Sequence, residues 1–316
     1  MGFRHVVRIE ILRCSQRTKH SRCYIIMAHF PPGTALGGFE LLAHLGTGGQ
    51  GTVYLARPWD DHALRRHLIG RWLRTGHQRG QLMANHAADW NLAAIKVAHP
   101  DAMAALHDEH SHLLGQATLH PHLTALYGRR YTSSLRDLGL AQVDGQTCLY
   151  LALVYETGMP LHLWLAHHPG PCSLAWAISL GLQVASALEH VHQCGLIHHD
   201  LRPANLMVRS TASGQPHVVL IDFGAVESIA RPRRRALYGV PHLLPPERQG
   251  PHPGPATPHV DIYALGRLLQ LLTAGHPLTP DLSALLSDAT RPVLRERVAA
   301  LPSMKDFRER LLAVRQ

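Results

Sequence analysis

Short apolar runs separated by glycine-rich turns dominate the first half of the chain, and this pattern predicts β-strands. The runs lie at residues 39–45, 52–56, 93–98 and 148–156. Four glycines lie between the first two runs, as in a tight hairpin. A helix is expected at 102–117, between the third run and the fourth. The first half of the chain is therefore predicted to be a β-rich unit.

Helical spacing replaces this pattern in the second half of the chain. Apolar residues recur every three or four positions from 173 to 193, and a second strongly apolar helix is expected at 260–274. A β-rich half followed by a helix-rich half predicts an α+β fold of two lobes with a cleft near residue 157. The expected lobes are residues 37–156 and 157–316.

Residues 57–92 interrupt the strand pattern and contain three of the five tryptophans. Leu64, Leu68 and Trp72 recur at helical spacing among several arginines, which predicts a basic amphipathic helix. We expect this Trp-rich insert to pack on the body of the protein rather than to lie on a membrane or on a partner.

The composition is that of a folded protein with reduced cysteines. A chain of 316 residues that is 46% hydrophobic and 17% charged has enough apolar surface to bury a large core, which excludes disorder as its main state. No apolar run approaches the roughly 18 to 20 residues of a membrane span. The five cysteines are few, odd in number and not at metal-ligand spacing, which favours the cytoplasm. The 26 histidines are scattered, so no metal site is expected among them.

The positive charge is concentrated at the start of the chain. Residues 1–26 carry six Lys/Arg and one Glu, so +5 of the net charge of +9 lies there and the remainder carries only +4. This distribution does not favour nucleic-acid binding. Residues 1–36 are predicted to be a basic N-terminal extension that is disordered or reflects a mis-assigned start, because Met27 offers a second start. They contain no continuous apolar segment, so we do not expect a secretory signal.

The turn at 46–53 reads Gly-Thr-Gly-Gly-Gln-Gly-Thr-Val, which is a G-x-G-x-x-G-x-V pattern between two strands. Glycines let backbone N–H groups approach phosphate oxygens closely. A hairpin turn alone would also explain them. A dinucleotide-binding motif would need a helix directly after the glycines, whereas a strand is expected here.

Lys96 lies in the middle of the apolar run 93–98, where a buried ammonium group is costly unless an anion meets it. A lysine whose side chain simply extends to solvent is an equally good interpretation of this run alone. Together with the glycine-rich loop upstream, the position suits a lysine that reaches the phosphates of ATP.

Four further motifs resemble those of protein kinases. Residues 198–208 (HHDLRPANLMV) resemble the catalytic loop H-R-D-L-K-P-x-N, and Asp222-Phe223-Gly224 follows the apolar run 218–221 as the metal-binding loop does. Turn chemistry alone often places Asp-x-Gly after a strand. Residues 239–247 (GVPHLLPPE) and 261–266 (DIYALG) resemble two scaffold motifs of the same family. The chain is thus similar to the eukaryotic-like, bacterial-type serine/threonine protein kinases over about residues 39–312.

The resemblance implies a role for each candidate residue. Asp200 would orient the acceptor hydroxyl and take its proton, with Arg202 beside it. Asn205 and Asp222 would hold Mg²⁺, or Mn²⁺ as an alternative, because their oxygens are hard ligands. The ion-pair partner of Lys96 would be Glu109, with Asp108 as the competing choice.

The implied nucleotide site draws on both lobes. The hinge would begin at Tyr155 and Glu156, whose backbone would bind adenine. The other implied contacts are the glycine-loop residues Gly46, Gly48 and Gly51 and the ring-packing residues Val53, Ala94 and Met207.

Several positions depart from the family pattern. His199 stands where many kinases carry the arginine that pairs with a phosphorylated activation loop, and Ser228 and Tyr238 are the only hydroxyl side chains between Gly224 and Pro246. We therefore expect a non-RD enzyme that is constitutively competent or controlled by a separate regulatory protein. No attached sensor domain is expected.

Other departures bear on activity and on the scaffold. Arg202 and Val240 replace a lysine and a threonine, which predicts reduced activity. Leu301 stands where the family has the arginine that pairs with Glu247. Arg297 is the residue that we consider as a substitute partner for Glu247. Arginines at 231 and 233–235 are most simply a solvated face, but they would also favour acidic substrates.

Three functions follow from these features. The first is a cytoplasmic kinase that transfers the γ-phosphoryl group of ATP, bound with Mg²⁺, to a serine or threonine of a protein substrate. The second is a pseudokinase that acts as a nucleotide-binding scaffold, as the departures would allow. The third is a small-molecule phosphotransferase of the aminoglycoside-kinase kind, against which the motifs at 246–247 and 261–266 argue.

Overall fold

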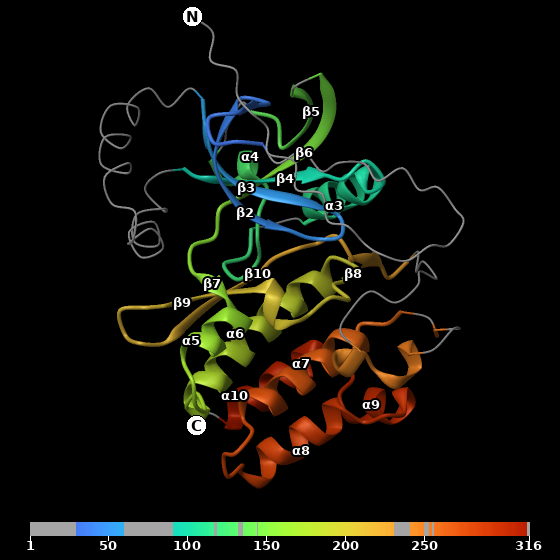
Figure 1. The fold of residues 1–316 in the computed structure, drawn as a ribbon. Coiled ribbons are helices and arrows are strands. Elements are labelled where there is room, and N and C mark those ends of the chain that lie inside the picture. Colours follow the sequence, from blue (N-terminus) through green and yellow to red (C-terminus); the bar gives the residue numbers. More distant parts are fainter. Residues whose placement is uncertain are drawn as a thin grey trace, which may run out of the picture.

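The computed structural model describes residues 30–59, 91–116, 119–131, 135–143, 145–230, 241–249, 253–254 and 256–314. These residues form two lobes, a β-rich N-terminal lobe and a largely helical C-terminal lobe, as the sequence predicts (Figure 1). Most of the Trp-rich insert, including its predicted helix, lies outside the described residues, and so do residues 1–29 of the predicted extension.

A six-stranded antiparallel sheet forms the N-terminal lobe, with strand order β1-β2-β3-β4-β6-β5. The strands are β1 (Ala35–Leu36), β2 (Phe39–Thr47), β3 (Gly51–Pro58), β4 (Ala93–Ala98), β5 (Leu138–Val143) and β6 (Gln146–Val154). The lobe also contains the helices α3 (Met103–Gly115) and α4 (Tyr127–Tyr131). The predicted strands and the predicted helix at 102–117 are all present, with bounds that differ by a few residues.

Residues 30–36 belong to the N-terminal lobe, so the predicted boundary at residue 37 is too late. Phe30 is buried and its backbone N–H donates to the hydroxyl of Tyr54 at 3.2 Å. Leu36 is buried as well, and β1 pairs with the start of β2. Burial of these two side chains among the aromatic residues of the sheet gives the segment a fixed place.

The two faces of this sheet have different surroundings because side chains alternate along each strand. One face carries Tyr54, Ile95 and Tyr150, which pack in a buried cluster with Phe39. Lys96 projects from the opposite face of β4, and its cross-strand neighbours are Val53 and Leu151. The alternation therefore places the lysine on the face that belongs to the larger core shared by both lobes.

The C-terminal lobe contains the remaining elements. Its strands are β7 (Met159–Pro160), β8 (Leu196–Ile197), β9 (Leu206–Ser210), β10 (Pro216–Leu220) and β11 (Glu227–Ser228). Its α-helices are α5 (Leu161–His167), α6 (Leu174–Gln193), α7 (His259–Leu272), α8 (Pro280–Ala289), α9 (Leu294–Ala300) and α10 (Met304–Val314). Three short 3₁₀ helices are η2 (Pro203–Asn205), η3 (Pro241–Leu243) and η4 (Pro246–Arg248). In Figure 1 the strands β9 and β10 lie between the sheet of the N-terminal lobe and the helices α7 to α10.

Helix α6 is the central helix of the C-terminal lobe. The side chain of Ser173 caps it by accepting from the backbone N–H of Trp176 at 3.2 Å. Among the described residues, α6 is the one helix long and apolar enough, by length and composition, to cross a membrane. Within the fold, 61% of that stretch is buried, against α7, α10 and β10. The sequence predicts this helix at 173–193, where polar residues such as Gln183 interrupt the apolar positions.

The lobes are joined at several places, and two of these lie at β9 and β10. The chain passes directly from β6 to β7 through Gly158, whose φ is +116° and whose added Cβ would lie 2.3 Å from the carbonyl oxygen of Val208. Only glycine fits there. The segment after α3 also contacts β10, because the N–H of Thr124 donates to the carbonyl of Leu220 at 3.0 Å. Both contacts fix the position of β9 and β10 below the N-terminal sheet.

Candidate active site

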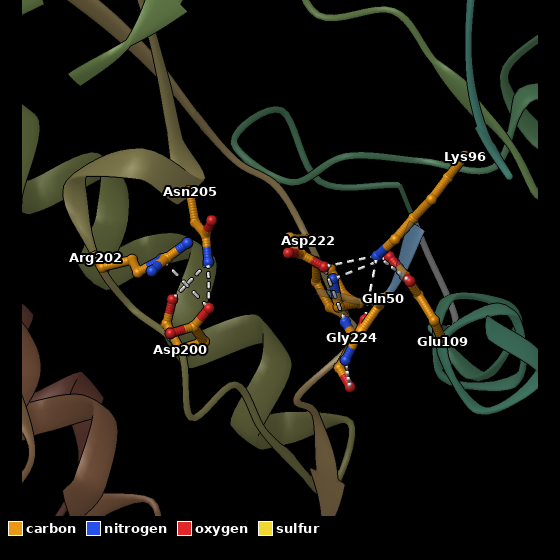
Figure 2. A network of polar contacts seen from close by, with 9 residues as sticks. Gln50, Lys96, Glu109, Asp200, Arg202, Asn205, Asp222 and Gly224 are labelled. Atoms are coloured by element: carbon orange, nitrogen blue, oxygen red, sulfur yellow. Dashed lines mark hydrogen bonds and ion pairs between the residues drawn. The ribbon is translucent and has the colours of Figure 1, made fainter. Parts of the chain in front are cut away.

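Lys96 is the centre of a buried network that joins three elements. Its Nζ lies 2.7 Å from Oε2 of Glu109 on α3 and 2.9 Å from Oδ1 of Asp222, as Figure 2 shows. Of the two acidic residues considered from the sequence, Glu109 is therefore the one in contact with Lys96. The other carboxylate oxygen of Glu109 accepts from the backbone N–H of Phe223 at 3.2 Å. The same carboxylate therefore fixes the start of the loop after β10.

Lys96 and Asp222 stabilise each other's charge, whereas burial raises the pKa of Glu109 despite the ammonium of Lys96 beside it. Burial alone would lower the pKa of Lys96, but the carboxylates of Glu109 and Asp222 outweigh it and raise that pKa above its usual value. Burial would raise the pKa of Asp222, but the ammonium of Lys96 holds it below its usual range. Lys96 and Asp222 are therefore both charged at neutral pH.

The loop that carries Asp200 is held from below by Asp261, which is fully buried near the start of α7. The two carboxylate oxygens of Asp261 accept from the backbone N–H groups of His198 and His199, each at 2.9 Å. Nε2 of His192 lies 2.8 Å from one of these oxygens. Burial would raise the pKa of Asp261, but the contact with His192 and the other imidazoles lowers it to about 2. A charged Asp261 therefore fixes the backbone that precedes Asp200.

Asp200 contacts the two polar side chains that follow it in its loop. Nδ2 of Asn205 donates to Oδ2 of Asp200 at 2.8 Å and to the carbonyl of Asp200 at 2.9 Å (Figure 2). Nε of Arg202 lies 3.5 Å from Oδ2 of Asp200. Burial raises the pKa of Asp200, and Arg202 and Asn205 partly offset that effect. The loop therefore presents a carboxylate whose direction is fixed by hydrogen bonds.

The predicted metal ligands have the chemistry that Mg²⁺ requires. Asp222 offers a carboxylate, and Asn205 turns its amide nitrogen toward Asp200, which leaves its oxygen for a cation. Among the described residues no group of three or more His, Cys, Asp or Glu side chains gathers as a metal site. Mg²⁺ commonly takes one or two protein ligands and completes its shell with phosphate oxygens and water. The donor set thus fits a magnesium ion that is bound together with a polyphosphate.

The predicted nucleotide-binding residues are partly brought together. Strand register puts Val53 opposite Lys96, and Ala94 lies two residues before Lys96, so these three side chains share one face of the sheet. Met207 lies on β9, and Glu156 follows β6. Met207 and Ala94 come from different lobes, and the packing of both on an adenine ring stays a prediction.

The glycines of the loop divide into two kinds. An added Cβ at Gly51 would lie 2.4 Å from the carbonyl oxygen of Val97, so close packing of strands explains this glycine. At Gly46 and Gly48 an added Cβ would meet no protein atom within 4 Å. Packing in the structure therefore does not explain why glycine stands at these two positions, although the approach of a ligand would.

Three features near the site were not predicted from the sequence: the contacts of Gln50, the contact of Glu227, and the raised pKa of Glu156. Gln50 contacts Lys96 and Gly224, and Glu227 on β11 lies with its Oε2 3.6 Å from Nε2 of the buried His199. Glu156 is half-buried, and that burial raises the pKa of its carboxyl to about 7 despite the nearby Arg130 and Arg209. Glutamine in a glycine-rich loop is the one signal that the sequence offered; the other two depend on contacts between distant segments.

His199 has an unusual position for the residue before Asp200. Its φ is +67°, which is rare for a residue with a side chain, and its imidazole is buried. Burial chiefly lowers the pKa of this imidazole to about 4, so it is neutral at pH 7.

Several other positions singled out from the sequence lie outside the described residues. They are Val240, Tyr238 and the arginines at 231 and 233–235.

We expect the protein to lose stability as the pH falls from about 6.5 toward 4. The imidazoles of His120, His199 and His217 each have a pKa lowered to about 4, chiefly because burial disfavours the charged form. In the unfolded chain they titrate near pH 6.5. Across this window the unfolded state binds more protons, so the free energy of unfolding rises with pH. Thermal melting measured between pH 7 and pH 4.5 tests this expectation.

A matched pair of variants isolates the histidine contribution. His217→Gln should flatten the dependence of the melting temperature on pH, whereas the exposed His167→Gln should not. The raised pKa of Glu156 has the opposite effect on the pH dependence of stability. Its contribution to the free energy of unfolding is complete below about pH 4.5 and is lost as the pH rises through 7. Equal slopes for wild type and His217→Gln would contradict the prediction.

The comparison with known proteins agrees with this geometry. A two-lobed α+β fold that joins a strand lysine, a helix glutamate and an aspartate after β10 defines the protein kinase class of fold. Residues 81–309 match the family model described as the protein kinase domain, which is more than half of the chain. The chain therefore belongs to the protein kinase family. The glycine-rich loop lies before the matched residues.

The relatives with similar sequences are bacterial serine/threonine protein kinases. PkaA of Streptomyces coelicolor is 32% identical over 238 residues, which cover 74% of this chain and 38% of PkaA. PknB of Mycobacterium tuberculosis is 29% identical over 249 residues, covering 77% of this chain and 33% of PknB. PrkC of Bacillus subtilis is 27% identical over 273 residues, which cover 85% of this chain and 34% of PrkC. The chain spans about two fifths or less of the length of these relatives.

Proposed function

We propose that this chain binds ATP with Mg²⁺ between its lobes and transfers the γ-phosphoryl group to a serine or threonine of a protein substrate. The observation that carries the proposal is the ion pair of Lys96 with Glu109 and Asp222, together with the hydrogen-bonded pair of Asp200 and Asn205. Phosphoryl transfer depends mainly on positioning and charge stabilisation, and these two groups supply both.

Each residue has a part in the proposed reaction. Lys96 holds the phosphates of ATP and is itself oriented by Glu109, while the glycine-rich loop at Gly46 and Gly48 covers the phosphates, which approach closely because these residues have no side chain. Asp222 and Asn205 hold Mg²⁺, which neutralises charge on the transferred phosphoryl group when it is bound. Asp200 orients the acceptor hydroxyl and takes its proton as the hydroxyl oxygen bonds to the γ-phosphorus. The bond from that phosphorus to the β-phosphate oxygen breaks, and ADP leaves. Val53, Ala94, Met207 and the backbone at Glu156 bind the adenine ring.

The proposed control does not need phosphorylation of the activation segment. His199, which is neutral at pH 7, stands where an arginine would need a phosphate partner, and it faces Glu227 instead. We therefore favour an enzyme that is constitutively competent or regulated by a separate protein. The cytoplasm, which supplies ATP, is the proposed location.

One observation favours the alternative of a nucleotide-binding pseudokinase. Arg202 lies 3.5 Å from Asp200, and this ion pair engages the carboxylate that would have to take the proton of an acceptor hydroxyl. The pseudokinase and the enzyme share nucleotide binding and differ in phosphoryl transfer.

The nucleotide half of the proposal is tested by the magnesium dependence of ATP binding. We expect wild type to bind ATP roughly tenfold more tightly with Mg²⁺ than in EDTA, because the ion, held by Asp222, would neutralise negative charge on the phosphates. In Asp222→Asn the ratio of the two dissociation constants should fall toward one. Calorimetric titration gives both constants.

Asp281→Asn is the matched control, because Asp281 is exposed at the start of α8, away from the network of Lys96. It should keep the wild-type ratio. The ratio is the informative quantity, since Asp222 also contacts Lys96 and its loss changes ATP binding even without the metal. A full magnesium effect in Asp222→Asn would show that the proposed ligand is wrong.

A further inference from the structure

Gln50 reaches across from the glycine-rich loop to the loop after β10. Its Nε2 donates to the carbonyl oxygen of Gly224 at 3.2 Å, and its Oε1 accepts from Nζ of Lys96 at 3.4 Å. Figure 2 shows the carboxamide of Gln50 beside Lys96, Asp222 and Gly224. The side chain thus joins segments that are 174 residues apart in sequence.

The backbone of the loop is held without this side chain. The N–H of Gly48 donates to the carbonyl of Gly51 at 2.9 Å, and the carbonyl of Gln50 accepts from the N–H of His99 at 3.1 Å. The carboxamide is therefore not needed to shape the turn. Its contacts instead hold the loop against Gly224, where an added Cβ would come within 2.0 Å of Oε1 of Gln50.

The atoms of the carboxamide match those that a bound phosphate would replace. Lys96 has three ammonium protons, of which two are directed at Glu109 and Asp222. The third donor meets a neutral amide oxygen, at a length typical of a weak hydrogen bond. A phosphate oxygen carries negative charge and makes a stronger bond to an ammonium group than an amide oxygen does.

We propose that Gln50 occupies the phosphate position of the protein's own nucleotide site, and that ATP must displace its carboxamide from Lys96 in order to bind. This inference rests on the proposed function. In the protein without nucleotide, Gln50 closes the glycine-rich loop onto Gly224. Binding then breaks the two side-chain contacts of Gln50 before the phosphates reach Lys96, so part of the binding free energy is lost.

The test compares wild type with Gln50→Ala for three ligands that share adenine but differ in phosphates. Removing the carboxamide should tighten binding of ATP and ADP by roughly 3- to 10-fold, the effect of about one hydrogen bond. Adenosine lacks phosphates and should bind both proteins equally. Gln50→Glu, whose carboxylate would bind Lys96 more strongly, should weaken ATP and ADP binding. The dissociation constants come from calorimetry or from fluorescence titration.

Gln142→Ala is the matched control, because Gln142 is exposed and donates across the β5–β6 hairpin to Thr147. A second readout needs no nucleotide: amide hydrogen exchange at residues 48–51 should be faster in Gln50→Ala than in wild type, because the loop has lost its contact with Gly224. Unchanged exchange would overturn the proposed closure.

Two outcomes of the binding experiment separate this inference from the proposed function. If wild type binds ATP and Gln50→Ala binds it equally or more weakly, the competition inferred for Gln50 is wrong while the nucleotide site stands. If neither protein binds ATP, ADP or adenosine, the proposed nucleotide site itself is wrong, and the inference fails with it.

Discussion

Replacing Asp200 by alanine is expected to lower the rate of γ-phosphoryl transfer by about 10³-fold, within the range that loss of a positioned general base produces. The carboxylate of Asp200 is fixed by Asn205 and by the clamp of Asp261 on the preceding backbone. Its loss removes the group that orients and deprotonates the acceptor hydroxyl. Incubation with radiolabelled ATP and Mg²⁺ measures the labelling of the protein and of added substrates.

Measuring the binding of ATP separates a loss of catalysis from a loss of folding or of nucleotide binding. Lys96 and Asp222 are unchanged in the variant, so the dissociation constant for ATP should stay within about threefold of wild type. Asp200→Asn is the second variant, because the amide keeps the size of the side chain and loses the basic oxygen. Equal labelling by wild type and both variants would reject the catalytic role and leave the pseudokinase interpretation.

Much of the fold was predictable because local patterns and long-range packing agree. The strand at 93–98 was predicted with the bounds of β4, and the helix at 173–193 differs from α6 only by its capping residue. The spacing of apolar residues indicates which face of a strand or helix is buried. Such elements can therefore be predicted from one sequence. Residues 30–36 were missed because the order of that segment depends on Tyr54, which lies 24 residues from Phe30.

The residues of the candidate site also differ in how far the sequence predicts them. The network of Lys96, Asp200, Asn205 and Asp222 could be anticipated because each residue lies in a short motif with its own chemistry. The choice between Asp108 and Glu109 could not be made from spacing, since neighbouring helix positions differ in direction by about 100° and only the packing of α3 decides which one faces Lys96. The contacts of Gln50 and Glu227 join distant segments, and no local pattern encodes them.

Backbone clamps by buried carboxylates connect this site to one helix in each lobe. Asp261 holds the backbone of His198 and His199, and Glu109 holds the backbone of Phe223. Each carboxylate comes from a helix outside the loop that it holds. The loops of the site therefore owe their positions to α3 and α7, and a loss of packing in either helix is expected to reduce activity without any change in the motifs.

Replacing Arg297 by alanine is expected to destabilise the protein by about 3 to 5 kcal/mol, the cost of breaking a buried ion pair by removing one partner. Arg297 on α9 is fully buried and pairs with Glu247, which the sequence left without its usual arginine. Its guanidinium also donates to the carbonyl of Arg291 and lies 5.2 Å from the ring centre of Tyr263 on α7. Removal leaves the carboxylate of Glu247 without this partner.

Urea unfolding of wild type, Arg297→Ala and Arg297→Lys measures this effect. Lysine keeps the charge, but it cannot bond both Glu247 and Arg291 with the fixed geometry of a guanidinium, so an intermediate loss is expected. Arg295→Ala is the control, because Arg295 lies exposed on the same helix and its removal should change stability by less than about 0.5 kcal/mol. If Arg297→Ala were no less stable than Arg295→Ala, the pair with Glu247 would not be what holds η4 against α9. The substitution of Leu301 for the usual arginine would then lack a structural compensation.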